Sequence, residues 1–311
     1  MVRVIRGGSE HSSHVDAGSG EQPPVPLQVA ALNLSPEPGD VEGNLRLAER
    51  ALTGARRAHP GLEWVVLPEL FTTAYSDLAS VHRHAENAER GPSARFFAAL
   101  ARDLGLHVAY GFPERLPAGG VSDSANLVGP GGILLTYRKR HLVRTTGEDL
   151  VFVPGAELPV VEAGGLRVAL VVCWDLGFPQ TVREAALAGA QLVLSPAGWR
   201  YPWGPQYDLS CAARALDNAV YLASANQLGA YPDAAFDAPG GVYGPDGTRV
   251  SLCCASADSV LSIASVDPYL PERWQRSYGS TLCEEDAEIV PQRSRPEPED
   301  LGEAHSRVLV S

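Results

Sequence analysis

The sequence predicts a mixed α and β protein in which sheets with both parallel and antiparallel strands are covered by helices. Two observations carry this prediction. Short apolar runs alternate with segments whose apolar residues recur at helical spacing, as in strand–helix units. Other strand-like runs are joined by turns rich in Gly and Pro, as in hairpins. No long linker interrupts this order, so we expect one domain over residues 26–285, with tails over residues 1–25 and 286–311.

The first half of the chain contains five apolar runs and two helical patterns. The first helix follows Asp40, whose side chain can cap it, and its apolar residues recur every three or four positions from Leu45 to Ala55. The turn sequence GPGG at residues 129–132 indicates a hairpin. The predicted strands lie at residues 27–33, 64–69, 107–112, 124–128 and 133–139, and the helices at 45–55 and 96–104.

The second half repeats the strand–helix alternation and ends in a second hairpin. Pro179 suits the first turn of a helix, where its missing N–H costs little. The predicted strands lie at residues 166–173, 191–197 and 220–227, the helices at 181–189 and 209–219, and the hairpin at 240–251.

Composition and charge exclude several classes of protein. A net charge of −12 disfavours binding to nucleic acid, which needs clustered Lys and Arg. Five cysteines, an odd number, do not form a secreted disulfide framework, so we expect reduced thiols and a cytoplasmic protein. Neither a signal peptide nor a membrane span is predicted, because the longest strongly apolar run, VALVVCW, is far shorter than the roughly 20 residues a bilayer requires.

Three reactive side chains each lie at the end of a predicted strand. They are Glu69 in VVLPEL, Lys139 in LLTYRKRHL and Cys173 in LVVCWD. Strand ends can present side chains to one pocket from a rigid scaffold. Taken singly, each has an ordinary structural explanation: a core thiol, a surface acid, or a lysine at a solvated strand end.

Together the three residue types suit nucleophilic catalysis. A thiol is mostly protonated at neutral pH, so it needs a base, and Glu69 can take its proton. Attack on a carbonyl or nitrile carbon places negative charge on the oxygen or nitrogen, which Lys139 and the backbone N–H of Trp174 can stabilise.

Several motifs in this order resemble the nitrilase superfamily of carbon-nitrogen hydrolases. They are LPEL, YRKRHL and CWDLGFPQ around the three residues, the opening LQVAALNLSPEPGDVEGNLRLAE, and ARALDNAVYLASANQLG. The resemblance covers nearly the whole predicted domain. It implies an α+β fold, a four-layer αββα sandwich, with no metal and no organic cofactor.

The resemblance also implies roles for individual residues. Glu69 is the general base, Lys139 the stabilising cation and Cys173 the nucleophile. Glu148, just ahead of FVPG, matches a second glutamate of the family and is expected to support Lys139 or the substrate. One departure stands out: Gln180 occupies a position where the family usually has Glu, which weakens a structural ion pair without touching the triad.

These expectations lead to a hydrolase of a non-peptide C–N bond. The substrate is expected to be a small amide, ureido compound or nitrile, with amide or N-carbamoyl hydrolysis through a thioester preferred. A nitrilase acting through a thioimidate and a non-catalytic scaffold on the same fold are the alternatives. Trp174, Trp199, Tyr201 and Trp203 are candidate pocket residues. The resemblance further implies a homodimer or a higher homo-oligomer.

Overall fold

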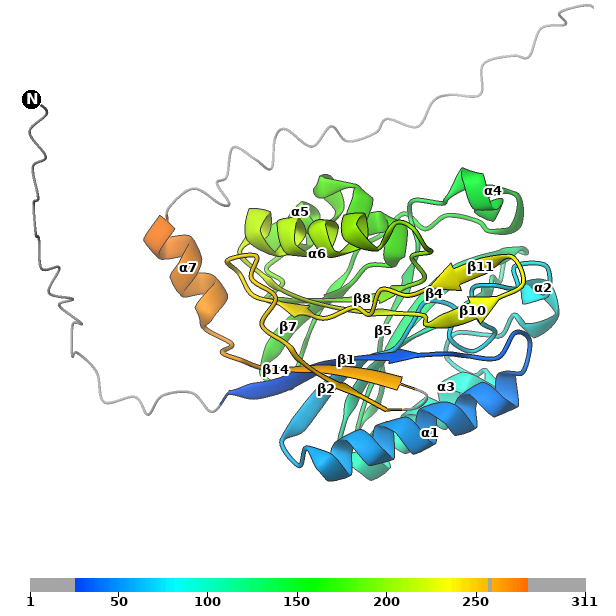
Figure 1. The fold of residues 1–311 in the computed structure, drawn as a ribbon, viewed down its shortest axis with the longest axis horizontal. Coiled ribbons are helices and arrows are strands. Elements are labelled where there is room, and N and C mark those ends of the chain that lie inside the picture. The colour runs from blue at the N-terminus through cyan, green and yellow to red at the C-terminus, as the bar shows by residue number, and fades with distance from the viewer. Residues whose placement is uncertain (1–25, 257–258, 279–311) are drawn as a thin grey trace, which may run out of the picture.

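Two sheets packed face to face, with helices on both outer faces, form the body of the protein (Figure 1). The computed structural model describes residues 26–256 and 259–278. The expected four-layer αββα sandwich is confirmed. The expectations for tails at 1–25 and 286–311, and for residues 279–285 of the domain, lie outside the described residues.

The larger sheet has seven strands in the order β13-β14-β1-β2-β3-β4-β5. β2 runs parallel to β1 and β3, and the other neighbours are antiparallel. The strands span Leu27–Leu34 (β1), Leu62–Val66 (β2), His107–Arg115 (β3), Val121–Gly129 (β4), Gly132–Arg138 (β5), Leu252–Ala255 (β13) and Ser259–Val266 (β14).

The smaller sheet has five strands in the order β12-β9-β8-β7-β6, with β7, β8 and β9 parallel. They span Val160–Ala163 (β6), Leu166–Leu170 (β7), Leu192–Ala197 (β8), Tyr221–Asn226 (β9) and Val242–Tyr243 (β12). A separate hairpin joins β10 (Gly229–Tyr231) to β11 (Ala234–Phe236).

Helices α1, α3, α5 and α6 cover the two sheets (Figure 1). α1 (Val41–Ala58) and α3 (Pro92–Leu104) lie on the seven-stranded sheet, and α5 (Pro179–Leu187) and α6 (Gly204–Asn218) lie on the five-stranded sheet. Asp40 caps α1 as expected, since its Oδ1 accepts the Gly43 N–H at 2.9 Å. The remaining helical elements are α2 (Val81–His84), α4 (Glu148–Val151), α7 (Leu270–Tyr278) and the 3₁₀ turns η1 (Arg144–Thr146) and η2 (Cys173–Gly177).

Strand periodicity explains the layers. On β2, Trp64 and Val66 belong to the core that includes both sheets, whereas Val65 belongs to the core beneath α1 and α3. Because successive side chains of a strand point to opposite faces, one strand supplies both cores. Within residues 26–256 and 259–278, every helix is too short or too polar to cross a bilayer.

Several predicted element boundaries were wrong. The strand predicted over 64–69 ends at Val66, and Pro68 lacks the N–H that would continue the ladder. The strand predicted over 166–173 ends at Leu170. The hairpin predicted at 240–251 reduces to β12, which pairs with β9, and one bridge between Tyr243 and Arg249.

Candidate active site

The three candidate residues lie just beyond strand ends, and both sheets contribute to the site. Glu69 follows β2 and Lys139 follows β5 of the seven-stranded sheet, while Cys173 follows β7 of the five-stranded sheet. The Glu69 N–H donates a hydrogen bond to the Ala197 carbonyl at the end of β8, at 3.2 Å. This bond links one sheet to the other beside the site. All three side chains are buried.

Lys139 is the centre of a buried ion cluster. Its Nζ lies 2.5 Å from Glu69 Oε1 and 2.8 Å from Glu148 Oε1. Asp123 Oδ2 is 3.5 Å away. The structure therefore brings Lys139 together with Glu69 and with the expected supporting acid Glu148, and adds a third carboxyl group that sequence reasoning missed.

Glu148 is held by three donors. Its Oε1 accepts Lys139 Nζ and the Tyr75 hydroxyl, and its Oε2 accepts the Val143 N–H at 2.8 Å. Glu69 is different, because its Oε2 is buried and has no hydrogen-bond donor among the described residues. That oxygen is free to accept a proton.

Burial dominates the protonation of the site. Burial raises the pKa of the Cys173 thiol well above its usual value, and the negative charge of Glu69 adds to this effect. Burial also raises the pKa of Glu69, while the Lys139 ammonium offsets part of the increase. Burial opposes the charge of Lys139, but the nearby carboxylates outweigh it and raise the pKa of the ammonium. The free site thus holds a neutral thiol, which needs a base before it can attack.

The backbone at Cys173 adopts a left-handed conformation, with φ of 47°, which is uncommon for a residue other than Gly. Asp175 holds this turn: its Oδ2 accepts the Val172 N–H at 3.0 Å and the Tyr137 hydroxyl at 2.8 Å. The Trp174 N–H has no acceptor within the described residues. The expected tight turn after the strand is therefore present at Cys173, and the N–H that follows it is without an acceptor.

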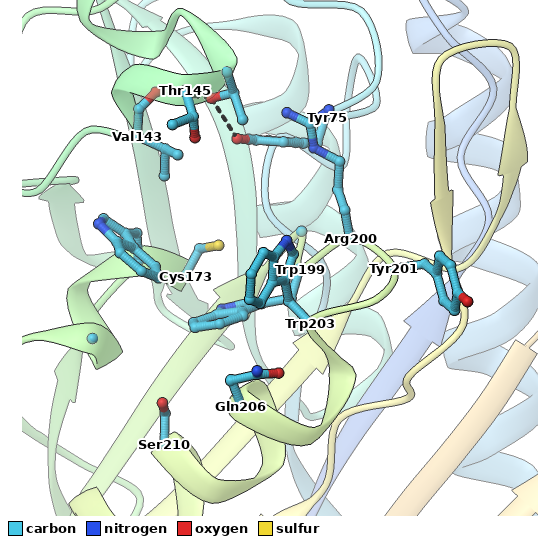
Figure 2. Close-up of a pocket in the computed structure, with 14 residues that line it drawn as sticks. Tyr75, Val143, Thr145, Cys173, Trp199, Arg200, Tyr201, Trp203, Gln206 and Ser210 are labelled. Atoms are coloured by element: carbon cyan, nitrogen blue, oxygen red, sulfur yellow. Dashed lines mark hydrogen bonds between the residues drawn. The ribbon is translucent and has the colours of Figure 1, made fainter.

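Cys173 opens onto a cavity of about 710 Å³. Figure 2 shows the sulfur pointing into it, toward Trp199 and Trp203. All four aromatic residues expected from the sequence line the cavity: Trp174, Trp199, Tyr201 and Trp203. Trp199 is buried and packs on Trp174 with a ring separation of 5.3 Å, whereas Tyr201 and Trp203 are exposed at the rim.

Sequence reasoning missed four further residues of the site. Asp123 lies in β4, where every residue is buried. An acidic residue inside such a strand was the sequence feature that could have identified it as a site residue. Tyr75 and Gly198 line the cavity beside the ion cluster, and Arg200 lines its wall. Their neighbouring sequences, TTAYSD and AGWRYPWG, have no pattern that assigns these positions to the site.

The acidic cluster has a spacing that suits a cation. Oxygen atoms of Glu69, Asp123 and Glu148 lie within 4.8 Å of one another, as metal ligands can. Lys139 Nζ is within 4 Å of all three side chains. The chain itself therefore supplies the positive charge at this point, and we assign the cluster to the lysine.

Comparisons with known proteins agree with this geometry. The sequence pattern of a family described as carbon-nitrogen hydrolase matches residues 28–276. A Pseudomonas protegens protein described as "Hydrolase in pqqF 5'region" is 34% identical over 246 residues, covering 78% of this chain and 84% of its own. A nitrilase of Pyrococcus abyssi is 30% identical over 247 residues, covering 78% and 91%. The crystal structure of an amidase from Nesterenkonia sp. has a TM-score of 0.67 and 30% identity, covering 82% and 96%.

Proposed function

The chain belongs to the carbon-nitrogen hydrolase family of the nitrilase superfamily, enzymes that act on non-peptide C–N bonds, and we propose that it hydrolyses a small amide or N-carbamoyl compound through a thioester on Cys173. The observation that carries this proposal is the free, buried Oε2 of Glu69 in a cluster that also contains Lys139 and the thiol. A carboxylate beside the thiol is the base that a protonated thiol requires.

The first half of the proposed reaction forms the thioester. Glu69 takes the Cys173 proton as the sulfur attacks the carbonyl carbon, and the carbonyl oxygen becomes negatively charged. Lys139 and the Trp174 N–H stabilise that charge. Glu69 then returns the proton to the nitrogen, the C–N bond breaks, and ammonia or an amine leaves.

The second half releases the acid. Glu69 takes a proton from water, whose oxygen attacks the thioester carbon. The C–S bond breaks, the proton returns to the sulfur, and the carboxylic acid departs. Because Glu69 acts as base, acid and base again, its raised pKa suits the cycle by letting both protonation states form.

Removal of the thiol is the direct test. We expect Cys173→Ala to abolish ammonia release from a panel of amides, ureido acids and nitriles. Cys211→Ala is the matched control, because Cys211 is also buried but does not line the cavity. If Cys173→Ala still hydrolyses a substrate while Cys211→Ala does not, Cys173 is excluded as the nucleophile. The scaffold alternative requires that the wild-type protein hydrolyse no compound of the panel.

A nitrilase would use the same residues and pass through a thioimidate. We prefer the amidase on the CWD sequence after the nucleophile, where Asp175 stands in place of Glu. Matched nitriles and amides with the same carbon skeleton separate the two activities. Consumption of the nitrile to the acid with the amide untouched would reverse the preference.

Two properties of the whole protein are part of the proposal. We propose a cytoplasmic enzyme, in line with its odd number of cysteines. We also propose a homodimer that uses the outer face of α6, where Leu209 and Leu216 are 68% and 48% exposed, seven residues apart and so on one side of the helix. We expect Leu209→Glu with Leu216→Glu to convert the dimer to a monomer in light scattering, and a wild-type monomer would contradict this.

A further inference from the structure

Three buried acids share one buried cation in the active site. The side chains of Glu69, Asp123, Glu148 and Lys139 are all inaccessible to solvent. With every acid ionised, three negative charges and one positive charge would leave a net charge of −2. A buried net charge is costly, and the usual response of such a cluster is to bind a proton.

Hydrogen bonding shows which acid is suited to hold that proton. Glu148 accepts three donors, and Glu69 accepts Lys139 Nζ at 2.5 Å. Asp123 receives none: both of its oxygens are buried without a hydrogen-bond partner among the described residues, and Lys139 Nζ is 3.5 Å away. An ionised carboxylate without donors is the least stable of the three.

We propose that Asp123 is a neutral carboxylic acid in the working enzyme and donates its proton in a hydrogen bond to the carboxylate of Glu69. It is a positioning residue that acts through Glu69 and so rests on the proposed role of Glu69 as base. The bond gives Asp123 the partner it otherwise lacks. It also holds the Glu69 carboxylate in place while leaving it ionised and able to take the thiol proton.

The charges that face Asp123 agree with this assignment. Burial raises its pKa well above the usual value, the carboxylates of Glu69 and Glu148 raise it further, and Lys139 opposes them. Burial raises the pKa of Glu69, and Lys139 and the hydrogen bond from Asp123 offset part of that increase. Tyr75 and Cys173 also face the cluster, and both are neutral because burial raises the pKa of each.

Two substitutions separate a neutral donor from an ionised carboxylate. Asp123→Asn supplies an N–H₂ donor of the same shape, so we expect kcat within about threefold of the wild type. Asp123→Ala removes the donor, and we expect kcat to fall about ten- to a hundredfold with KM little changed. Equal, large losses in both folded variants would show that an ionised Asp123 is required and would overturn the proposal.

Stability against pH gives a readout independent of catalysis. The folded wild type keeps the Asp123 proton, whereas the unfolded chain releases it above about pH 4. The unfolded state then binds fewer protons, so the free energy of unfolding falls as pH rises. We expect Asp123→Asn to reduce this slope by about one proton and the exposed control Asp103→Asn to leave it unchanged. An unchanged slope in Asp123→Asn would overturn the proposal.

Infrared spectroscopy can detect a protonated carboxyl group in the wild-type protein, without a substitution. We expect a protonated carboxyl band at neutral pH that shifts when aspartate carries ¹³C in its carboxyl group and disappears in Asp123→Asn. Absence of an aspartate-sensitive band would overturn the proposal even if Asp123→Asn does not fold. If instead Glu69→Gln hydrolyses amides normally, the role of Glu69 as base fails, while the band and the slope still report the proton on Asp123.

Discussion

Gly198 lies where the cavity meets the ion cluster, and the site has no room for a side chain there. A Cβ at this position would lie 2.8 Å from Glu69 Oε2 and 2.9 Å from the Tyr75 ring. Gly177 lines the same cavity, but its Cβ would meet nothing closer than the Trp174 ring at 3.6 Å. The two glycines form a matched pair for substitution.

We expect Gly198→Ala to lower kcat about a hundredfold, because a displacement of the base by a fraction of an ångström to an ångström disrupts the alignment of reacting atoms. Gly177→Ala should remain within a few-fold of the wild type. Steady-state kinetics on one amide, with circular dichroism to show folding, provides the comparison. Equal activities of the two variants would contradict the described packing around Glu69.

Arg200 carries a half-buried guanidinium in the cavity wall. Figure 2 shows its side chain reaching along the wall toward Tyr75, and both residues also line a neighbouring small cavity with Asp233. Among the described residues, no hydrogen bond or ion pair to this guanidinium is formed, whereas the half-buried Arg140 pairs with Glu184 at 2.6 Å. A free guanidinium beside a substrate cavity suits an anionic group on the substrate.

We therefore expect an amide that also carries a carboxylate to be hydrolysed better than its neutral ester or methyl analogue. Arg200→Gln should raise KM for the acidic amide about tenfold or more and leave the neutral analogue little changed. Arg144→Gln, on an exposed residue just outside the cavity lining, is the control. Equal effects of Arg200→Gln on both substrates would indicate a structural role for Arg200.

At this scale the sequence predicted the positions of the three candidate residues better than their surroundings. Glu69, Lys139 and Cys173 each follow a strand, and strand ends are visible as the end of an apolar run. Asp123 reaches the site through the direction of its side chain, and Arg200 through the path of its loop. Neither property can be read from the sequence pattern. Cys253 and Cys254 lie in β13 and are exposed, and β13 is the outer strand of its sheet.

Asp175 joins two elements of the site. Besides supporting the turn at Cys173, its Oδ1 accepts the His141 N–H at 3.0 Å and lies 2.8 Å from His141 Nδ1. His141 is two residues beyond Lys139 and stacks on Phe178 at 3.8 Å. One carboxylate thus fixes the segment after β5 against the turn after β7, so the lysine and the thiol are placed relative to each other.

We expect Asp175→Ala to lower the free energy of unfolding by about 3 kcal/mol or more, because it leaves buried donors such as the Tyr137 hydroxyl unpaired. Urea unfolding measures the change. Asp217→Ala, on the exposed side of α6, is the control and should change stability by less than about 0.5 kcal/mol. A loss in Asp175→Ala no greater than in Asp217→Ala would contradict the joining role.

Most of the longer elements were predictable because alternation and helical spacing are local properties, but the eight-residue β14 was not predicted. The ends of the elements were less predictable. β2 stops before Pro68 and Glu69, although the apolar run continues beyond the end of the strand. β6 was not predicted, since its four residues, VVEA, are too short a run to stand out. The partner of β12 was also missed, because pairing with β9 depends on how distant segments pack.

Across the whole molecule, the packing between the sheets determines the active site. Val65 and Val66 are adjacent on β2 and equally buried, but Val66 faces the core shared with the other sheet and Val65 faces the helices. Substitution of either valine by Ala removes the same side-chain atoms, but each substitution removes them from a different layer. The order of the layers came from the resemblance to a family, whereas the residues alone predicted only mixed sheets covered by helices.

We expect Val65→Ala and Val66→Ala each to lower the free energy of unfolding by about 2 kcal/mol. Only Val66→Ala should also lower kcat, by about tenfold, because it alters the spacing between the sheets that carry Glu69 and Cys173. Urea unfolding and steady-state kinetics on both proteins test this. A similar decrease of kcat in Val65→Ala would show that general destabilisation, and not the spacing of the sheets, sets the rate.

The division of the reacting groups between two sheets has a practical consequence. A cut in the exposed loop between Ala156 and Glu157 would leave Glu69 and Lys139 on one fragment, residues 26–156, and Cys173 on the other, residues 157–278. Under the proposed mechanism neither piece alone releases ammonia. β14 on the second piece offers β1 on the first an eight-residue pairing surface. Fused to two proteins that associate, these halves would form a complementation reporter whose signal appears only on reassembly.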